Sequence, residues 1–270
     1  MSAVDPVSSA VYMVSGYNSI LSGTNANAVF PELWMLAARP GSGGTNWTWT
    51  NLTPSLAPAA GVAAPAQLAT GDLYGQRLFQ VFGRSDGDFA WDTVGATYSD
   101  PGFLTVFDLR APLVGVPVSR MPIKVGPPAA NVAGGSTVVA ATFSPRFLAG
   151  STRVGSLLYV VGGISGAFSP ALVGAGSGYG PFNDSFVVID LATGVGKQLS
   201  TLGGATDVRV APHGNIFPVV FSSRDGARVH VWGGADYAAS DVLDPATLYT
   251  YTVASDTWST SHINARMGLG

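Results

Sequence analysis

The most regular pattern in the chain is a short apolar run that ends in glycine. Its clearest copy is Leu157–Gly163, where five apolar or aromatic residues precede a glycine pair. A run of this kind predicts a buried strand, and the glycines predict the turn that ends it. The pattern returns at Ala10–Gly16, Arg77–Gly83 and Arg228–Gly234. Its recurrence indicates that the chain repeats one structural unit.

Each copy of the run is followed by a polar, glycine-rich connection and then by two further strand-like segments. In the third unit these segments are residues 183–190 and 197–200, and Ala192–Gly194 predicts a tight turn between them. Apolar residues never keep a helical spacing, and 35 glycines and 18 prolines interrupt the chain. We therefore predict an all-β fold made of four-stranded antiparallel units. The strand that precedes the run is expected in three units, at Ala66–Thr70, Arg146–Gly150 and Phe217–Ser222.

Repeated four-stranded units predict a β-propeller with four blades in one domain. The first unit has no β-prone stretch ahead of its apolar run. Because Arg266–Gly268 matches Arg153–Gly155, we expect residues 263–270 to pair with the N-terminal strand as the missing inner strand. This pairing would close the ring and leave no unpaired sheet edge. A portion of a larger ring, or a ring shared with another chain, remains an alternative. The expected single domain spans residues 1–270, with blades at about 1–60, 61–125, 126–202 and 203–262.

Several features of these units resemble kelch repeats. They are the glycine pairs, the Asn183–Asp184 opening of a strand, Asp190 at its end, and a tryptophan on the last strand. The resemblance covers most of the chain, although Ser15–Gly16 and Gly83–Arg84 stand in for the pair in the first two units. It implies kelch-like blades whose glycines allow close approach and whose tryptophans pack between blades. The structural repeat residues are then Gly16, Gly83, Gly162, Gly163, Gly233, Gly234, Trp49 and Trp258.

The long connections all fall at one end of the expected blades. In an up-and-down meander, the connection between the second and third strands and the connection to the next blade leave from the same face. The connections at the opposite face are short turns, such as Ala192–Gly194 and Ala254–Asp256. Because rigid scaffolds carry binding residues on loops, we predict binding at the long-loop face. The aromatic and polar candidates there are Tyr17, Asn18, Arg84, Asp86, Asp88, Phe89, Trp91, Tyr98, Tyr179, Phe182, Asp236 and Tyr237.

Charge and hydropathy exclude two classes of partner. Charged residues make up 11% of the chain, the net charge is −3, and Lys124 and Lys197 are its lysines. Without a basic cluster, we expect no nucleic-acid partner. No apolar run reaches the roughly 18 residues of a membrane helix, so we expect no membrane insertion. Met1–Pro6 lacks the parts of a signal peptide, which leaves either a protein that is not secreted or a mature form or fragment.

The search for catalytic chemistry is negative. The chain has no cysteine, which excludes disulfides, thiolate metal sites and thiol catalysis. It also excludes the copper-radical chemistry of galactose oxidase, a kelch-type propeller that depends on a Cys–Tyr crosslink. The three histidines lie in separate segments, and Asp86 and Asp88 do not follow the spacing of a calcium loop. Nucleophile-elbow, phosphate-loop and zinc-helix motifs do not occur. We therefore expect a non-catalytic protein without a metal or a cofactor.

The function predicted from these patterns is a binding scaffold that docks a protein or peptide partner on the long-loop face. One alternative is a carbohydrate-binding or sugar-active extracellular propeller, because aromatic loops with aspartate and asparagine suit sugars. Another is a structural surface or matrix protein, which the low charge allows. Low lysine content favours an extracellular or cell-surface location. The sequons at Asn46 and Asn51 then predict glycosylation if the protein is secreted.

Overall fold

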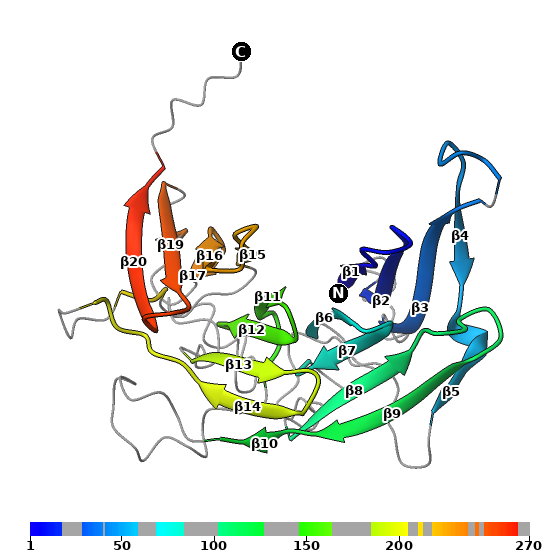
Figure 1. Ribbon diagram of the computed structural model, residues 1–270, viewed down its shortest axis with the longest axis horizontal. Helices are drawn as coiled ribbons and strands as arrows, with labels where there is room; N and C mark the ends of the chain where they lie inside the picture. Colours follow the sequence, from blue (N-terminus) through cyan, green and yellow to red (C-terminus); the bar gives the residue numbers. More distant parts are fainter. Residues whose placement is uncertain are drawn as a thin grey trace, which may run out of the picture. The chain divides into compact units, whose positions relative to one another are not determined.

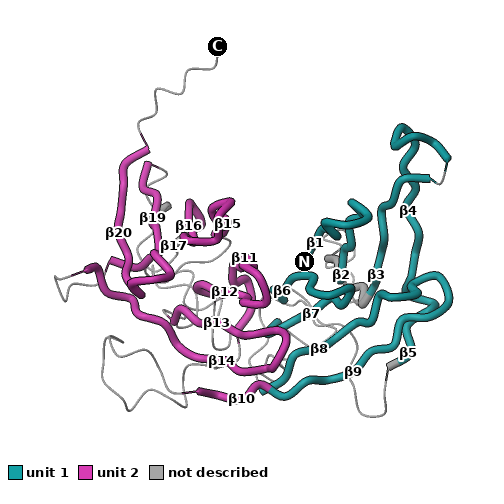
Figure 2. The backbone as a smooth tube through the Cα atoms, viewed as in Figure 1, with its two compact units in different colours: residues 1–90, 96–122 teal, residues 91–95, 123–270 magenta. Residues whose placement is uncertain are grey.

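The fold is described by a computed structural model. It describes residues 1–17, 29–39, 41–58, 69–83, 102–126, 146–163, 185–204, 210–212, 218–236, 241–242 and 246–263. Within these ranges the helical structure is the short 3-10 helix η2 (Thr53–Ser55), and the other regular elements are strands. No helix in the described ranges has the length and apolar character needed to cross a membrane. The chain divides into two compact units, residues 1–90 with 96–122 and residues 91–95 with 123–270 (Figure 2).

The first unit contains two blades (Figure 1, blue to green). In the first blade the order is β1-β2-β3-β4, and every neighbouring pair is antiparallel. In the second blade the order is β5-β9-β8-β7-β6, and β5 is the parallel member. The bounds are β1 (Ser2–Val4), β2 (Val11–Tyr17), β3 (Val29–Ala38), β4 (Trp47–Asn51), β5 (Leu56–Pro58), β6 (Thr70–Tyr74), β7 (Arg77–Val81), β8 (Phe103–Asp108) and β9 (Val116–Pro122).

The second unit repeats this arrangement (Figure 1, green to red). The third blade has the order β10-β14-β13-β12-β11 with β10 parallel to β14, and the fourth has the antiparallel order β15-β16-β19-β20. A two-stranded hairpin, β17–β18, lies within the β16–β19 connection. The bounds are β10 (Lys124–Val125), β11 (Gly150–Val154), β12 (Leu157–Val161), β13 (Phe186–Asp190), β14 (Val195–Gln198), β15 (Val219–Ser222), β16 (Arg228–Trp232), β17 (Ala235–Asp236), β18 (Asp241–Val242), β19 (Thr247–Thr252) and β20 (Thr257–His262).

The predicted fold class is confirmed. The chain is an all-β propeller with four mainly antiparallel blades of four or five strands. Each apolar run ending in glycine forms the second strand of its blade, namely β2, β7, β12 or β16. The continuous apolar character of Leu158–Val161 is explained by burial, because all four of these side chains are buried. The blade boundaries expected from the sequence remain a prediction.

Two details differ from the expectation. The first blade does have its own inner strand, because Ser2–Val4 pairs with β2 from Val11 to Met13. The stretches expected as first strands at Ala66–Thr70 and Arg146–Gly150 begin too early, since β6 and β11 start at the last residue of each. The pairing is fixed by two-residue turns at Gly75 and Gly155, and not by the apolar residues on which the expected bounds rested. The proposed pairing partner, residues 264–270, lies outside the described residues.

A further difference is the fifth strand of the second and third blades. The connections that leave β4 and β9 were expected as loops, yet they contain β5 and β10. Each of these short strands pairs in parallel with the fourth strand of the following blade. The chain therefore closes the outer edge of a blade before it enters that blade.

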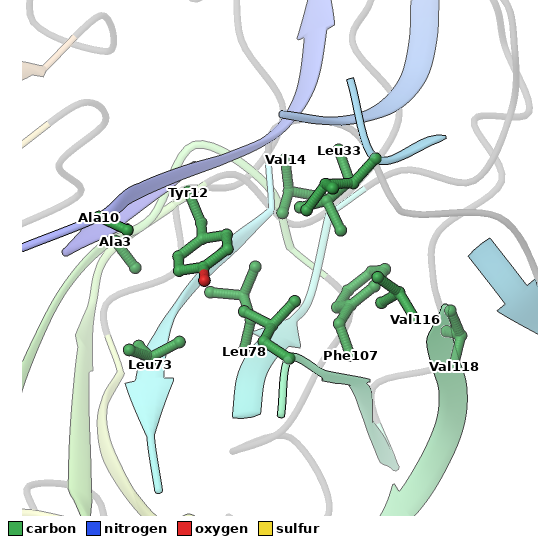
Figure 3. Packing of buried hydrophobic residues seen from close by; sticks show 12 residues of the cluster. Ala3, Ala10, Tyr12, Val14, Leu33, Leu73, Leu78, Phe107, Val116 and Val118 are labelled. Carbon is green, nitrogen blue, oxygen red and sulfur yellow. The ribbon is translucent and has the colours of Figure 1, made fainter. Parts of the chain in front are cut away.

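The core of the first unit lies between the facing sides of its two sheets. Figure 3 shows Tyr12 and Val14 of β2 lying over Leu78 of β7 and Phe107 of β8. Leu33 of β3 joins the same cluster. Val14, Leu33, Leu78 and Phe107 have no exposed surface. Burying side chains of this size contributes about 1.5–3 kcal/mol each, so this cluster holds the first two blades together.

The core of the second unit is more aromatic. Phe186 of β13 contacts Tyr251 edge-on at a centroid separation of 4.7 Å and Trp258 at 4.9 Å. Tyr159 of β12 lies 6.0 Å from Phe186, and Val229 and Val231 of β16 complete the cluster. Edge-to-face aromatic pairs add about 0.5–1.5 kcal/mol beyond the area that they bury. Aromatic packing therefore joins the third blade to the fourth.

Candidate functional site

The long connections begin at a fixed backbone conformation. Gly162 and Gly163, after β12, have φ angles of 69° and 100°, and the glycine pair after β16 has 61° and 92°. In the second blade the matching pair is Phe82–Gly83, at 60° and 95°. A Cβ on Gly163 would lie 2.9 Å from the carbonyl oxygen of Phe147. Glycine is required here because φ is positive and backbone approaches closely, and Phe82 shows that the first position tolerates strain.

A buried arginine ties three strands together where the third blade's long connection begins. Arg146 precedes β11 and has no exposed surface. Its Nη1 donates to the carbonyl oxygen of Gly162 at 3.3 Å, and its Nη2 donates to the Ser185 hydroxyl at 2.6 Å. Burial lowers the pKa of Arg146 to about 9. Because its donors point into the blade's own backbone, Arg146 holds the ends of the loop in place. The sequence marked it only as the start of a strand.

The predicted binding residues fall almost entirely outside the described residues. Tyr17 lies at the end of β2, and Asp236 lies on β17. The set therefore stays a prediction. The members outside the described residues are Asn18, Arg84, Asp86, Asp88, Phe89, Trp91, Tyr98, Tyr179, Phe182 and Tyr237.

One predicted residue has a defined backbone register. Asp236 on β17 lies directly opposite Asp241 on β18 in the antiparallel pair. Across the described ranges, no group of three or more histidine, aspartate or glutamate side chains is placed to hold a metal ion. The two aspartates form a cross-strand register pair within the long-loop connection of the fourth blade.

The two repeat tryptophans have different environments. Trp258, on β20, is 3% exposed, and its Nε1 donates to the carbonyl oxygen of Ser200 at 2.8 Å. Trp49, on β4, is 48% exposed. Packing between blades thus describes Trp258, whereas the same role for Trp49 stays a prediction. In the first blade, Gly16 follows a β-bulge at Val14.

The short turns at the opposite ends of the blades are closed by their own aspartates. Asp5 accepts hydrogen bonds from the backbone of Val7 and from Ser8, and Asp190 accepts them from the backbone of Ala192 and from Thr193. Burial raises the pKa of Asp190, but the hydrogen bonds from Thr193, Ser156 and Ala192 lower it by more, so it lies below its usual range. These carboxylates are structural turn fasteners.

An open pocket of about 490 Å³ lies at the short-turn end of the second blade. Its polar groups are Asp108 and Arg110, and its walls include Ala57, Val114 and Pro117. The Arg110 Nε donates to both oxygens of Asp108, at 2.8 and 3.0 Å. Hydrogen bonding from Arg110 lowers the pKa of Asp108 despite burial. Asp108 is therefore ionised at neutral pH and paired with Arg110, and neither Tyr17 nor Asp236, the two predicted residues within the described ranges, lines this pocket.

The histidine on the second strand of the fourth blade also has a structural explanation. His230 is half-buried, its Nδ1 lies 3.0 Å from the Thr250 hydroxyl, and its ring stacks on Phe221 at 5.1 Å. Burial lowers its pKa, and the charge of Arg228 lowers it further. The lowered pKa favours the neutral imidazole, and its contacts within the sheet indicate a structural role.

Sequence reasoning missed one surface feature. Trp47 and Trp49 alternate with threonine along β4, and both are nearly half exposed, at 47% and 48%. Met13 of β2, at 44%, and Val4 of β1, at 55%, are further exposed apolar residues of this blade. The signal in the sequence was the Trp-Thr-Trp alternation, which places both tryptophans on one face of a strand.

No protein-family model matches the chain, and no curated protein sequence matches it. The class of protein is therefore defined by the fold alone, as a four-bladed β-propeller built of small antiparallel sheets.

Proposed function

We propose that the chain is a kelch-like propeller that acts as a non-catalytic binding scaffold and docks a protein or peptide partner on its long-loop face. The kelch-like assignment is supported by the positive φ angles of Gly162–Gly163 and Gly233–Gly234. It is also supported by Asp190 at the end of β13 and by the burial of Trp258 between blades.

The observation that carries the binding proposal is the unequal length of the connections at the two ends of a blade. In the third blade β12 ends at Val161 and β13 begins only at Phe186, whereas β13 ends at Asp190 and β14 begins at Val195. The short turns use their polar side chains internally, as Asp190 does. Long connections on a rigid scaffold supply adaptable contact residues, which supports the long-loop face as the binding surface.

Selection from a random peptide library displayed on phage tests the proposal. The comparison variant carries Phe89→Ala, Trp91→Ala and Tyr179→Ala on the predicted face. The matched control carries Val7→Ala, Leu113→Ala and Val114→Ala, which are 86%, 69% and 90% exposed in short turns. Enriched peptides are expected to bind the control variant as they bind the wild type, and to bind the loop variant at least tenfold more weakly.

Two outcomes contradict the proposal. One is the absence of any enriched peptide, and the other is equal binding to both variants. A glycan array with the same three proteins tests the carbohydrate alternative. If a saccharide binds the wild type but not the loop variant, the ligand of the long-loop face is a glycan and not a peptide.

A further inference from the structure

Three blades have the outer edge of their fourth strand covered by the chain that arrives from the blade before. In the second blade β5 covers β9, with Leu56 opposite Val116 and Pro58 opposite Val118. In the third blade β10 covers β14, with Val125 opposite Gly196. In the fourth blade the Trp258 amide donates to the carbonyl oxygen of Leu202 at 2.9 Å.

The covered positions are equivalent. Val118 pairs with Phe107 in the second blade, Gly196 with Ile189 in the third, and Trp258 with Tyr251 in the fourth. Each of these partners also pairs with the second residue of the repeated apolar run, namely Leu78, Leu158 or Val229, so the three residues occupy one row of the repeat. In the first blade the second residue of the run, Val11, pairs with Leu36, and Leu36 pairs with Trp49. A covering segment at the equivalent position of the first blade would therefore pair with the edge of β4 from Trp47 to Trp49.

The backbone of β4 is oriented to accept such a cover. The Arg39 amide donates to the Asn46 carbonyl, and the Leu52 amide donates to the Leu33 carbonyl. Because backbone groups alternate along a strand, Thr48 and Thr50 also face β3, and Trp47 and Trp49 face away from it. Among the described residues, β4 is the last strand of its sheet on that side.

The side chains of β4 do not protect this edge. Natural edge strands are blunted by charges, proline or a cover. Trp47–Asn51 has no charge and no proline, and its two tryptophans are about half exposed. The uncovered part of β20, by contrast, carries Ser259, Thr260 and Ser261. An apolar edge without protection is the kind of edge that pairs with another strand.

We propose that the edge of β4 at Trp47–Trp49 binds an extended peptide segment of a partner, which adds to the sheet as a parallel fifth strand. Parallel addition is expected because both β5 and β10 add in parallel. The segment carries an apolar residue, since Leu56 of β5 packs against the core of its unit. Backbone hydrogen bonds supply the affinity, as in other cases of strand addition. This surface is separate from the long-loop face, so the proposal stands apart from the proposed function.

Amide hydrogen exchange of the full chain, followed residue by residue by NMR, tests the proposal. The probes are three synthetic peptides with blocked ends that copy the natural covers, residues 54–60, 122–127 and 199–204. In the protein alone, the Trp47 and Trp49 amides should exchange rapidly. At millimolar concentration at least one peptide should slow both amides tenfold or more and leave the Thr48 amide unchanged.

Matched controls separate backbone pairing from contact with the indole. The same peptide with an N-methylated central residue should lose the effect, because it cannot donate the backbone hydrogen bond. Trp49→Pro removes the outward N–H and should abolish protection of Trp47, whereas Trp49→Ala keeps the N–H and should weaken binding only severalfold. A circular dichroism melt checks that each variant is folded.

Two results overturn the proposal. If Trp47 and Trp49 are already protected without peptide, at any protein concentration, the edge has an occupant other than a partner peptide. If both amides stay fast with all three peptides at millimolar concentration, the edge does not accept an added strand.

Discussion

Trp258 and Trp49 occupy the same position of two blades and have opposite environments. Trp258 pairs with Tyr251 and Trp49 with Leu36, and each partner pairs in turn with the second residue of the repeated run, Val229 or Val11. Trp258 is 3% exposed and bonded to Ser200, whereas Trp49 is 48% exposed. Both residues are tryptophans on the fourth strand of a blade, so neither the residue type nor the strand explains the difference in exposure.

What differs is what lies against the tryptophan: Trp258 packs on Phe186 of the third blade and is covered by the segment that precedes its own blade. Residues 199–204 run along β20, where Leu202 accepts the Trp258 amide and Ser200 accepts the indole. The described residues contain no such segment for β4. The comparison teaches that the repeat unit is completed by the chain before it, so a blade is not a self-contained block of sequence.

The largest expected effect comes from truncating the buried tryptophan. Trp258→Ala leaves a cavity beside Phe186 and removes the indole hydrogen bond to Ser200. It should lower the free energy of unfolding by about 3–5 kcal/mol, measured by urea denaturation. Trp49→Ala is the matched control and should change that free energy by less than about 1 kcal/mol. Equal losses would show that the two tryptophans have the same role.

A second substitution should displace the segment that covers β20, so that the fourth strand of the fourth blade becomes as exposed as β4. A Cβ on Gly203 would lie 2.4 Å from the Val210 side chain and 3.2 Å from the Trp258 carbonyl oxygen. Gly203→Ala should therefore push the covering segment away and cost about 1–3 kcal/mol of unfolding free energy. Trp258 fluorescence, recorded in a background where the other tryptophans are phenylalanine, should shift to longer wavelength. An unchanged spectrum would mean that the segment does not shield the indole.

A third change tests how the turn holds the covering segment. Asp256 Oδ1 accepts a hydrogen bond from the Ser200 amide at 3.0 Å and from the Tyr251 hydroxyl at 2.7 Å. Asp256→Ala removes the acceptor of both hydrogen bonds and should cost about 1–2 kcal/mol of unfolding free energy. Asp256→Asn keeps an acceptor and should recover most of this loss. If Asp256→Ala is as stable as the wild type, Asp256 does not hold the covering segment in place.

The smallest effect concerns a turn away from either tryptophan. The pKa of Asp190 is lowered in the folded protein, so its charged form stabilises the fold above the pKa of the unfolded chain. That contribution is lost as the pH falls from about 5 toward 2. Asp190→Asn should therefore be less stable than the wild type at pH 7 by about 0.5 kcal/mol, because the group lies near solvent. In urea denaturation, the difference in unfolding free energy between this variant and the wild type should disappear at pH 2–3. A difference that grows on acidification would contradict the stabilising role of the Asp190 carboxylate.

Much of the fold could be predicted from the sequence, because its signals are local. The run Leu157–Val161 and the glycine pair after it predicted β12 and its end, and Asp190 marked the end of β13. Pairings between distant short segments could not be predicted in this way. Leu56–Pro58 has no strand signal of its own, and it becomes β5 only because the edge of β9 is available.

The candidate site was less predictable than the fold. The aromatic loop residues were chosen by type, and a residue type does not give a position on a long connection. Arg146 was missed because its burial depends on Gly162 and Ser185, which are distant in the sequence. The exposure of Trp49 was missed for a related reason, since the residues that would cover it do not lie next to it in the chain.

The most direct test of the account compares the backbone amides of the two tryptophans in one sample of the wild-type protein. Native-state hydrogen exchange measures both at once and needs no substitution. The Trp258 amide, bonded to Leu202 at 2.9 Å, should be protected, and the Trp49 amide, which faces away from β3, should exchange rapidly. Rapid exchange at Trp258, or equal protection at both positions, would contradict the claim that the preceding segment completes the blade.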